Sequence, residues 1–311
     1  MMQGGHAVVG SLTTDEFSAR LEGGGLGIRV GPFDLHLRIR VSGLASRLRE
    51  LYRDYPLIDD DRVFSCRVTM HEVRSLRRGG ARMVRFLVDG RAPHEHMPAQ
   101  QALAVLEWGL NLATAMRHQG YLMLHSAVLE RGGRALLLPA APGYGKSTLC
   151  AALAHRGWRL LSDEFGLVRP GSIQFLPVPR LMPLKNESIA VIRAFAPEAV
   201  VGPEIVGTRK GTVAHVRPPG DCVTRAQEAA RAGWVVFPRW VAGASLVCEP
   251  VAKAQAFMRL ATNAFNYEVL GAPGFETVRQ LVEETASFRL VYSDLAEAVD
   301  VLTALADDRG G

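Results

Sequence analysis

The stretch that decides the fold covers residues 121–164 and reads YLMLHSAVLERGGRALLLPAAPGYGKSTLCAALAHRGWRLLSDE. Apolar runs alternate here with glycine-rich breaks, which is typical of strands that are connected through turns and helices. The pattern predicts a strand (121–130), a tight turn (131–134), a second strand (135–139), a glycine loop, a helix (146–155) and a third strand (158–162). This order of elements predicts an α/β fold.

The loop AAPGYGKS (140–147) matches the phosphate-binding pattern G-x-x-x-x-G-K-[ST] except at its first position, where Ala140 replaces glycine. Gly143 and Gly145 let backbone N–H groups turn inward around a phosphate, and the following helix adds its positive end. Lys146 then reaches the terminal phosphates, and the Ser147 hydroxyl can bind Mg²⁺. The alternative, a chance glycine-rich turn, is disfavoured by the strand and helix on either side. The predicted phosphate-binding residues are Pro142, Gly143, Tyr144, Gly145, Lys146, Ser147 and Thr148.

The hairpin before this loop predicts a place for one histidine. If Gly132 and Gly133 are the central residues of a two-residue turn, the register of the two strands sets His125 opposite Ala140. A histidine at that position can orient a phosphoryl group or exchange a proton near neutral pH. The alternative is a hydrogen-bonded packing residue, and the sequence leaves both open.

Two acids follow the third strand directly. Ligands of α/β sheets lie outside the carboxyl ends of the strands, so Asp163 and Glu164 are expected to face the nucleotide. Neighbouring residues in an extended segment point to opposite sides, which predicts different roles for the two. In one division Asp163 takes the proton of an attacking hydroxyl and Glu164 meets the metal, with Ser147 and Asp163 as further candidate ligands. The alternative is a solvated turn.

Two lysines further along the chain are additional candidates. Lys185 precedes a predicted helix that begins at Asn186 or Glu187 and ends at Phe195, where it can contact a phosphate or an acidic substrate group, and a capped surface lysine is the alternative. Lys210 belongs to the run Arg209-Lys210-Gly211-Thr212, which suits a mobile loop that closes on phosphate; a plain loop is the alternative. Both lysines are predicted to bind the nucleotide.

The segments LHSAVL (124–129), PGYGKST (142–148) and RGWRLLSDE (156–164) resemble the HPr kinase/phosphorylase superfamily. More closely, the chain is similar to the HprK-related kinase A family over residues 12–305. The segments that carry this similarity are GPFDLHLR (31–38), LYRDYPLIDDD (51–61), VRFLVDGRAP (84–93), VLEWGLNLA (105–113), LKNESI (184–189), KGTVAHVRPP (210–219), WVVFPR (234–239) and NAFNY (263–267).

The resemblance implies an ATP- and Mg²⁺-dependent kinase that phosphorylates a hydroxyl, such as the serine of a peptide or small protein. It implies Asp163 as the catalytic acid/base, His125 as the active-site histidine and Glu164 as a metal-side carboxylate, where the family commonly has a second aspartate. It also implies a companion PqqD-like peptide chaperone and a homo-oligomer. The alternatives are a small-molecule kinase or phosphorylase, and a nucleotide-binding module with little turnover, which Ala140 favours.

The domain prediction divides the chain into an N-terminal α+β domain (1–96), a connecting helix (97–119) and a phosphate-loop kinase-like domain with a mixed sheet (120–311). In the first domain we expect a helix (11–22) that begins at a Thr13/Glu16 capping box, a strand (33–41), a helix (42–54) and strands at 63–70 and 83–88. Further along, 198–208 is expected to be a flexible loop. Phe265 and Tyr267 are expected in the core, with stacking on a base as the alternative.

Composition narrows the class of protein further. The 311 residues are 48% hydrophobic and 22% charged with a net charge of +5 from scattered arginines, which does not predict nucleic-acid binding. Four separated cysteines form no CxxC pair, so neither a zinc site nor a disulfide framework is predicted. The first ten residues lack the pattern of a signal peptide, and no apolar run is long enough for a membrane span. A cytoplasmic protein is the resulting prediction.

Overall fold

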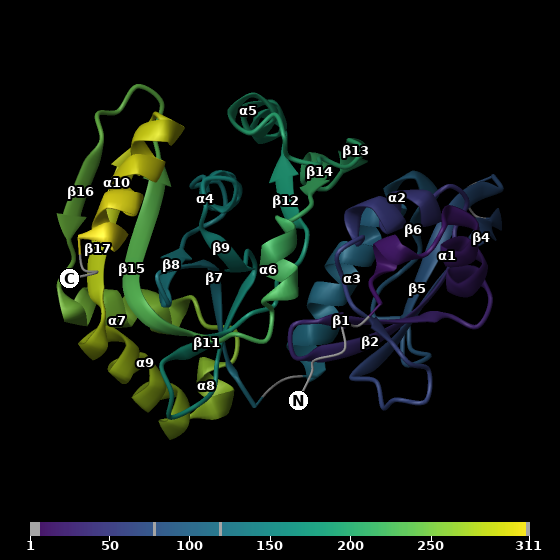
Figure 1. The fold of residues 1–311 in the computed structure, drawn as a ribbon, viewed down its shortest axis with the longest axis horizontal. Coiled ribbons are helices and arrows are strands. Elements are labelled where there is room, and N and C mark those ends of the chain that lie inside the picture. The colour runs from purple at the N-terminus through teal and green to yellow at the C-terminus, as the bar shows by residue number, and fades with distance from the viewer. Residues whose placement is uncertain (1–6, 77–78, 118–119, 309–311) are drawn as a thin grey trace.

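The chain folds into two lobes that meet along the middle of the molecule (Figure 1). The structure is a computed structural model that describes residues 7–76, 79–117 and 120–308. One lobe contains a six-stranded sheet, and the other contains an eight-stranded sheet together with a small three-stranded one. Both large sheets combine parallel with antiparallel pairs, so the fold is a mixed α/β fold.

The first lobe is built on a sheet with the strand order β3-β1-β2-β4-β5-β6. Its strands are β1 (Leu26–Val30), β2 (Phe33–Arg40), β3 (Leu57–Ile58), β4 (Cys66–Ser75), β5 (Ala81–Val88) and β6 (Met97–Pro98). Its helices are α1 (Thr14–Glu22), α2 (Ala45–Leu51) and α3 (Ala102–Arg117), with single 3₁₀ turns at Val9–Ser11 and Ala99–Gln101. The predicted capping box is confirmed, because the Thr13 side chain accepts from the Glu16 backbone and the Glu16 side chain accepts from the Thr13 backbone.

Several predicted bounds in this lobe are wrong. The helix predicted over 42–54 is restricted to Ala45–Leu51, and the strand predicted from residue 63 begins at Cys66. Strand β1 was not predicted, since it is only five residues long and directly follows three glycines. The connecting helix predicted over 97–119 begins at Ala102, and residues 118–119 lie outside the described residues.

The second lobe is organised on the sheet order β11-β10-β7-β8-β15-β17-β16, with β9 also paired to β7. Its strands are β7 (Leu122–Arg131), β8 (Arg134–Pro139), β9 (Arg159–Ser162), β10 (Phe165–Val168), β11 (Gln174–Leu176), β15 (Ala230–Trp240), β16 (Val247–Pro250) and β17 (Ala286–Tyr292). Its helices are α4 (Lys146–Ala154), α7 (Lys253–Thr262), α8 (Tyr267–Leu270), α9 (Ala272–Glu284) and α10 (Leu295–Asp307).

Helices cover both faces of this sheet because its central strands are apolar on both sides. Alternate residues of β7 and β8, such as Leu129 and Leu138, pack with α4 and α10, whereas Val128 and Leu137 pack with α7 and α9 on the other face. The glycine loop therefore emerges between a fully buried strand and a largely buried helix. Both ends of the loop are fixed by core packing.

The predicted hairpin register is confirmed. Arg131 pairs with Arg134, and the ladder continues to Ser126 opposite Pro139. Gly132 and Gly133 both have positive φ, 59° and 78°, as a two-residue turn with mirror-image geometry requires. The next position of the register brings His125 to the start of the glycine loop.

The chain around the two acids differs from the prediction. Strand β9 ends at Ser162 as expected, but β10 begins at Phe165 and continues alongside the same neighbour, β7. Both segments run antiparallel to β7, so Asp163 and Glu164 interrupt one long extended segment in its middle. The rule that ligands lie at the carboxyl ends of parallel strands therefore does not explain the position of the two acids. They lie instead at a local break in the antiparallel pairing with β7.

A small antiparallel sheet lies between the lobes, with the strand order β12-β14-β13. Its strands are β12 (Met182–Lys185), β13 (Ile205–Thr208) and β14 (Gly211–Val216), accompanied by α5 (Glu187–Phe195) and α6 (Gly220–Thr224). The flexible loop predicted over 198–208 is wrong for its last part, because Ile205–Thr208 is a paired strand. The residues expected to form a mobile loop are instead the tight turn of the β13–β14 hairpin.

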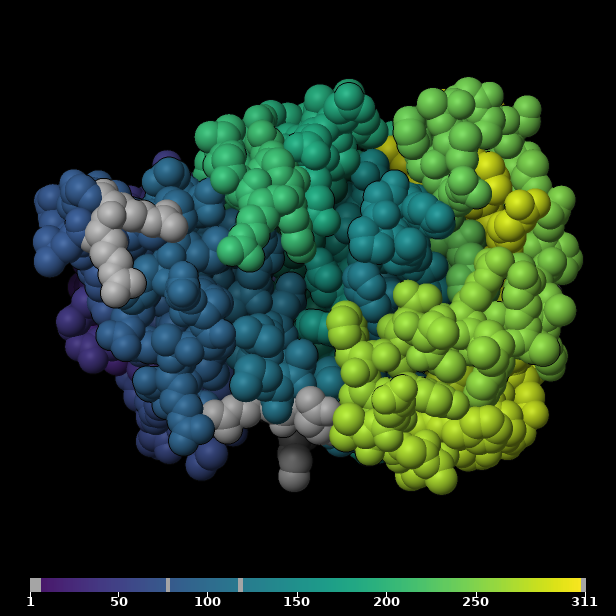
Figure 2. All heavy atoms as spheres, turned by 180° about the vertical axis from the view of Figure 1, so that it is seen from behind, coloured from purple at the N-terminus to yellow at the C-terminus, as the bar shows by residue number. Residues whose placement is uncertain are grey.

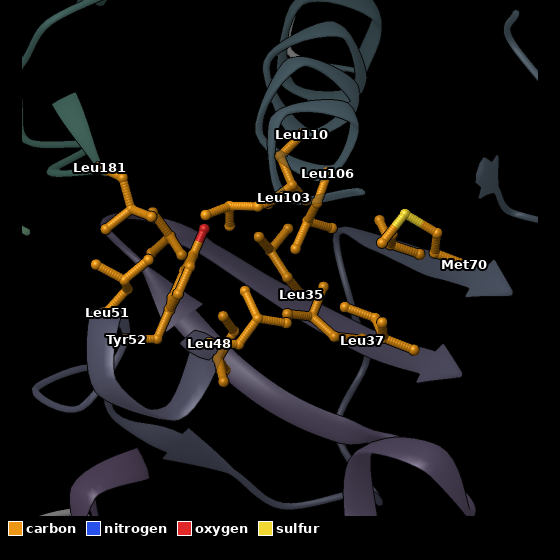
Figure 3. Packing of buried hydrophobic residues seen from close by; sticks show 14 of the residues in the cluster. Leu35, Leu37, Leu48, Leu51, Tyr52, Met70, Leu103, Leu106, Leu110 and Leu181 are labelled. Carbon is orange, nitrogen blue, oxygen red and sulfur yellow. The ribbon is translucent and has the colours of Figure 1, made fainter. Parts of the chain in front are cut away.

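One hydrophobic core crosses from the first lobe into the second. Leu48, Leu51 and Tyr52 of the first lobe pack with Leu106 of α3, and Leu181 of the second lobe joins the same cluster (Figure 3). Helix α3 thus contributes its apolar face to the core of the first lobe and contacts the second. Within the described residues, no helix is long and apolar enough to cross a membrane. Cys150, Cys222 and Cys248 are free thiols.

Candidate functional site

A cavity of about 460 Å³ opens where α4, β7 and the small sheet meet. One wall is the glycine loop with the start of α4, and the opposite wall is the end of β12, the start of α5 and the β13–β14 turn. Seen from behind, the surface is hollowed near its middle, where the teal and green parts of the chain meet (Figure 2). Segments separated by up to 85 residues in sequence thus share one site.

The glycine loop has the backbone that a phosphate cradle needs. Gly143 and Gly145 have φ values of 88° and 85°, a region that favours glycine. A Cβ atom on Gly145 would lie 2.7 Å from the Tyr292 hydroxyl, so this position has no room for a side chain. Gly145 is the N-cap residue of α4 and supplies no side-chain cap, so the first N–H groups of the helix are left for a ligand of the cavity. Ala140 has no positive φ, so alanine meets no backbone strain there.

Lys146 is fully buried at the start of α4 and paired with Asp163. Its Nζ donates to Asp163 Oδ1 at 3.0 Å and also to the Asp163 carbonyl. Burial opposes the charge of Lys146, but Asp163 and Glu164 outweigh it, and the lysine pKa is raised. For Asp163, burial dominates over the attraction of Lys146 and raises the pKa of the carboxyl.

The two acids point in different directions, as the sequence predicted. The Asp163 side chain is 2% exposed and does not line the large cavity, whereas Glu164 lines it with a side chain that is 31% exposed. In this structure Lys146 occupies one oxygen, Oδ1, of the carboxylate that was expected to take a proton. An acceptor can meet that oxygen only after Lys146 has moved to another partner.

His125 lies on the floor of the cavity beside Glu164. Its Nε2 is 3.9 Å from Glu164 Oε2, and its backbone N–H donates to the Asn263 carbonyl at 2.8 Å. Burial, together with the charge of Lys146, lowers the pKa of His125, so its ring is neutral at pH 7. Phe265, expected in the core, is instead 56% exposed, and its ring lies 5.4 Å from that of His125. Sequence reasoning missed this contact because α7 ends at Thr262 and residues 263–265 run beside β7, a strand that is distant in sequence.

The opposite wall brings two more lysines to the cavity. Lys185 ends β12, and Lys210 lies in the β13–β14 turn; both line the cavity, whereas Arg209 does not. Burial, followed by the charge of Lys210, lowers the pKa of Lys185. Between them Asn186 has a rare backbone conformation (φ 51°, ψ −125°) and is tied to Thr212 by hydrogen bonds in both directions. Strain of this kind clusters at functional sites.

Lysine usage is a signal in the sequence that the motif analysis missed. The chain has 36 basic residues but only four lysines, Lys146, Lys185, Lys210 and Lys253. Three of these four line one cavity. Lysine carries a compact charge and donors that can turn toward several oxygens, and this distinguishes it from arginine at a phosphate site.

Most predicted phosphate-binding residues line the cavity, and one does not. Pro142, Gly143, Gly145, Lys146, Ser147 and Thr148 are part of its wall. Tyr144 points away; its ring is 40% exposed and lies under the Arg239 guanidinium at 5.5 Å. The Tyr144 carbonyl accepts from the Trp240 N–H at 3.1 Å, which ties the loop to the end of β15. Tyr144 therefore fixes the loop from outside.

No protein-family model matches the chain, and no curated protein sequence matches it. Among solved structures, the chain is similar to the HPr(Ser) kinase/phosphatase from Coxiella burnetii, with a TM-score of 0.27 and 11% sequence identity over 60% of this chain and 95% of that chain. At this TM-score the likeness does not establish a shared fold. Membership of the HprK-related kinase A family stays a prediction, and function has to be argued from the cavity itself.

Proposed function

We propose that the protein is an ATP- and Mg²⁺-dependent phosphotransferase that phosphorylates a hydroxyl group. The observation that carries this proposal is the convergence on one cavity of the glycine loop, three of the four lysines, Glu164 and His125. Phosphoryl transfer needs positioning and charge neutralisation more than covalent chemistry. A cavity rich in cations and backbone N–H groups supplies both for a triphosphate.

The residues present fit a bound magnesium ion. Mg²⁺ prefers oxygen ligands and is usually held by one or two protein groups together with substrate phosphates. Ser147 and Glu164 offer such oxygens within the cavity, and among the described residues no group of three or more His, Cys, Asp or Glu forms an all-protein cage. When bound, Mg²⁺ would neutralise charge between the terminal phosphates.

The roles of the protein groups follow from their positions. The loop and α4 bind the phosphates, and Lys185 and Lys210 approach them from the opposite wall. We propose that phosphate draws Lys146 away from Asp163, so that Asp163 Oδ1 becomes free to take the acceptor's proton. The raised pKa of Asp163 suits a base better than that of an ordinary aspartate. Neutral His125 can accept or donate a hydrogen bond at the transferred group.

The proposed acceptor is a serine-type hydroxyl of a peptide or small protein, with a PqqD-like chaperone as a possible companion and a homo-oligomer as a possible assembly. These details rest on the family resemblance. The exposed Phe265, whose ring lies 5.4 Å from that of His125, offers an apolar surface next to a residue of the cavity, which favours a peptide side chain over a small metabolite. A phosphorylase or a metabolite kinase is the second candidate.

The experiment is transfer of ³²P from the γ-position of ATP to peptides containing serine, to hydroxylated metabolites and to water. Label on peptide supports the first candidate, and label on a metabolite alone supports the second. Tight ATP binding without any transfer would leave a nucleotide-binding module. Asp163→Asn should abolish transfer while ATP still binds, and normal transfer by this variant would remove Asp163 from the reaction.

A further inference from the structure

A second, much smaller cavity of about 20 Å³ lies against Asp163 from the side of α3. It is lined by Asp163, Arg180, Asn111 and Thr114, among others. Glu164 lines both cavities, whereas Asp163 and Arg180 line only the small one. The space is sufficient for one water molecule and for nothing larger.

Two buried polar atoms meet this small cavity without a partner. Asp163 Oδ2 and Arg180 Nε have no hydrogen-bond partner among the described residues, and both atoms are inaccessible to solvent. One is an acceptor and the other a donor. A buried charged group with an unmet hydrogen bond is costly, so such atoms in a native protein are normally paired directly or through water.

Arg180 is held rigidly by residues on α3. Its guanidinium donates to Glu107 Oε2 at 2.5 Å, to the Glu107 carbonyl at 2.9 Å and to Asn111 Oδ1. The Tyr52 hydroxyl of the first lobe donates to the other oxygen of Glu107 at 2.5 Å. In Figure 3 the Tyr52 oxygen points toward α3. These bonds use the terminal nitrogens of Arg180 and leave Nε for the cavity.

We propose that a water molecule in this cavity bridges Arg180 Nε and Asp163 Oδ2, and that Arg180 is a positioning residue for Asp163. The water accepts from Arg180 and donates to Asp163, and the Thr114 hydroxyl, which donates to Leu110, has lone pairs to accept its second proton. Anchoring Oδ2 in this way directs Oδ1 toward Lys146 and the large cavity.

The consequence is a role for the first lobe in the reaction. Tyr52 and Glu107 hold Arg180, and Arg180 holds Asp163, so the geometry of Asp163 depends on contacts between the lobes. The catalytic part of this inference rests on the proposed function, whereas the bridging water does not. The two parts are therefore tested separately.

The structural test is a crystal structure at a resolution that shows ordered water. We expect density in the small cavity within about 2.7–3.2 Å of both Arg180 Nε and Asp163 Oδ2. An empty cavity, or a water that contacts only one of the two atoms, overturns the proposal. This result is independent of whether the protein transfers phosphate.

The kinetic test uses Arg180→Lys, which keeps the charge beside Glu107 but removes the Nε–H donor. We expect kcat for transfer from ATP to fall about 10- to 100-fold, while KM for ATP stays within about twofold, because the glycine loop is unchanged. The matched control is Arg159→Lys, since the Arg159 side chain is 4% exposed, against 11% for Arg180, and donates to buried Glu130 at 2.5 Å, away from the cavity.

Both variants are expected to lose some stability, but only Arg180→Lys should change kcat. Wild-type kcat in folded Arg180→Lys, or an equal loss of kcat in Arg159→Lys, overturns the positioning role. If the wild-type protein transfers no phosphate to any acceptor or to water, the proposed function is wrong. In that case the crystal density of the wild type still decides whether the water bridge exists.

Discussion

At the scale of single residues, the buried pair of Lys146 and Asp163 links stability to function. Each group is fully buried, and each is the nearest opposite charge of the other. Removal of one partner from a buried ion pair leaves an uncompensated charge, whereas removal of both is often tolerated. The pair therefore allows structural and catalytic effects of substitution to be separated.

We predict that Lys146→Met lowers the free energy of unfolding by about 3–5 kcal/mol, because Asp163 is left buried without its cation. The double variant Lys146→Met/Asp163→Asn should recover most of this loss. In both variants the rate of phosphate transfer from ATP should fall at least about 100-fold. Urea unfolding and the labelled-ATP assay measure the two effects. Equal stability of the single and double variants would contradict the buried-pair interpretation.

Ala140 is the residue that departs from the phosphate-binding pattern, and its backbone indicates that the departure is harmless. We predict that Ala140→Gly changes the dissociation constant of ATP less than about threefold, because alanine is unstrained there, and lowers stability by about 0.4–1 kcal/mol through a more flexible unfolded chain. Fluorescence titration with a nucleotide analogue gives the affinity. A tenfold tighter complex would show that the Ala140 methyl obstructs the phosphate.

At the scale of elements, the β13–β14 hairpin places Lys210 at the cavity, although it is distant in sequence from the glycine loop. Its two turn residues are both basic, yet only Lys210 lines the cavity and its neighbour Arg209 does not. Two adjacent cations thus provide an internal comparison. The two residues are adjacent and carry the same charge, so they differ mainly in the direction of their side chains.

We predict that Lys210→Met weakens ATP binding about tenfold, since one direct charge–phosphate contact is worth about 1.4 kcal/mol in a partly buried site. Arg209→Met should change ATP affinity less than twofold, a factor that reflects only long-range charge. Isothermal titration at two salt concentrations provides the measurement. If both substitutions weaken ATP binding equally, the hairpin attracts ATP through long-range electrostatics, and Lys210 makes no direct contact with a phosphate.

The same elements show what could be predicted from the sequence. The hairpin register, the loop and the start of α4 were predictable because they depend on neighbours within a few residues. The burial of Asp163, the direction of Lys210 and the exposure of Phe265 were not. Each is decided by a segment that is distant in sequence: α4 and α3 for Asp163, the small sheet for Lys210, and the pairing of residues 263–265 with β7 for Phe265.

At the scale of the whole molecule, the interface between the lobes contains a buried histidine whose ring lacks hydrogen-bond partners among the described residues. His215 in β14 is fully buried, and its two ring nitrogens have no hydrogen-bond partner in the described part of the chain. Burial is the main cause that lowers the pKa of His215. The folded protein therefore keeps this ring neutral at a pH where the unfolded chain binds a proton.

The sign of the resulting pH dependence follows directly. Because the folded pKa lies below the unfolded value of about 6.5, the unfolded state gains a proton first on acidification, and stability falls as the pH drops through that value. Between pH 7.5 and 5.5 this single group can lower the free energy of unfolding by up to about 1.4 kcal/mol.

We predict that His215→Gln, whose side chain cannot titrate, loses up to about 1.4 kcal/mol less unfolding free energy than the wild type over the same pH range. The other histidines contribute equally to both proteins. Urea unfolding of the two proteins at both pH values measures the difference. Equal losses would mean that His215 is protonated inside the folded protein, and that the interface between the lobes admits solvent at acid pH.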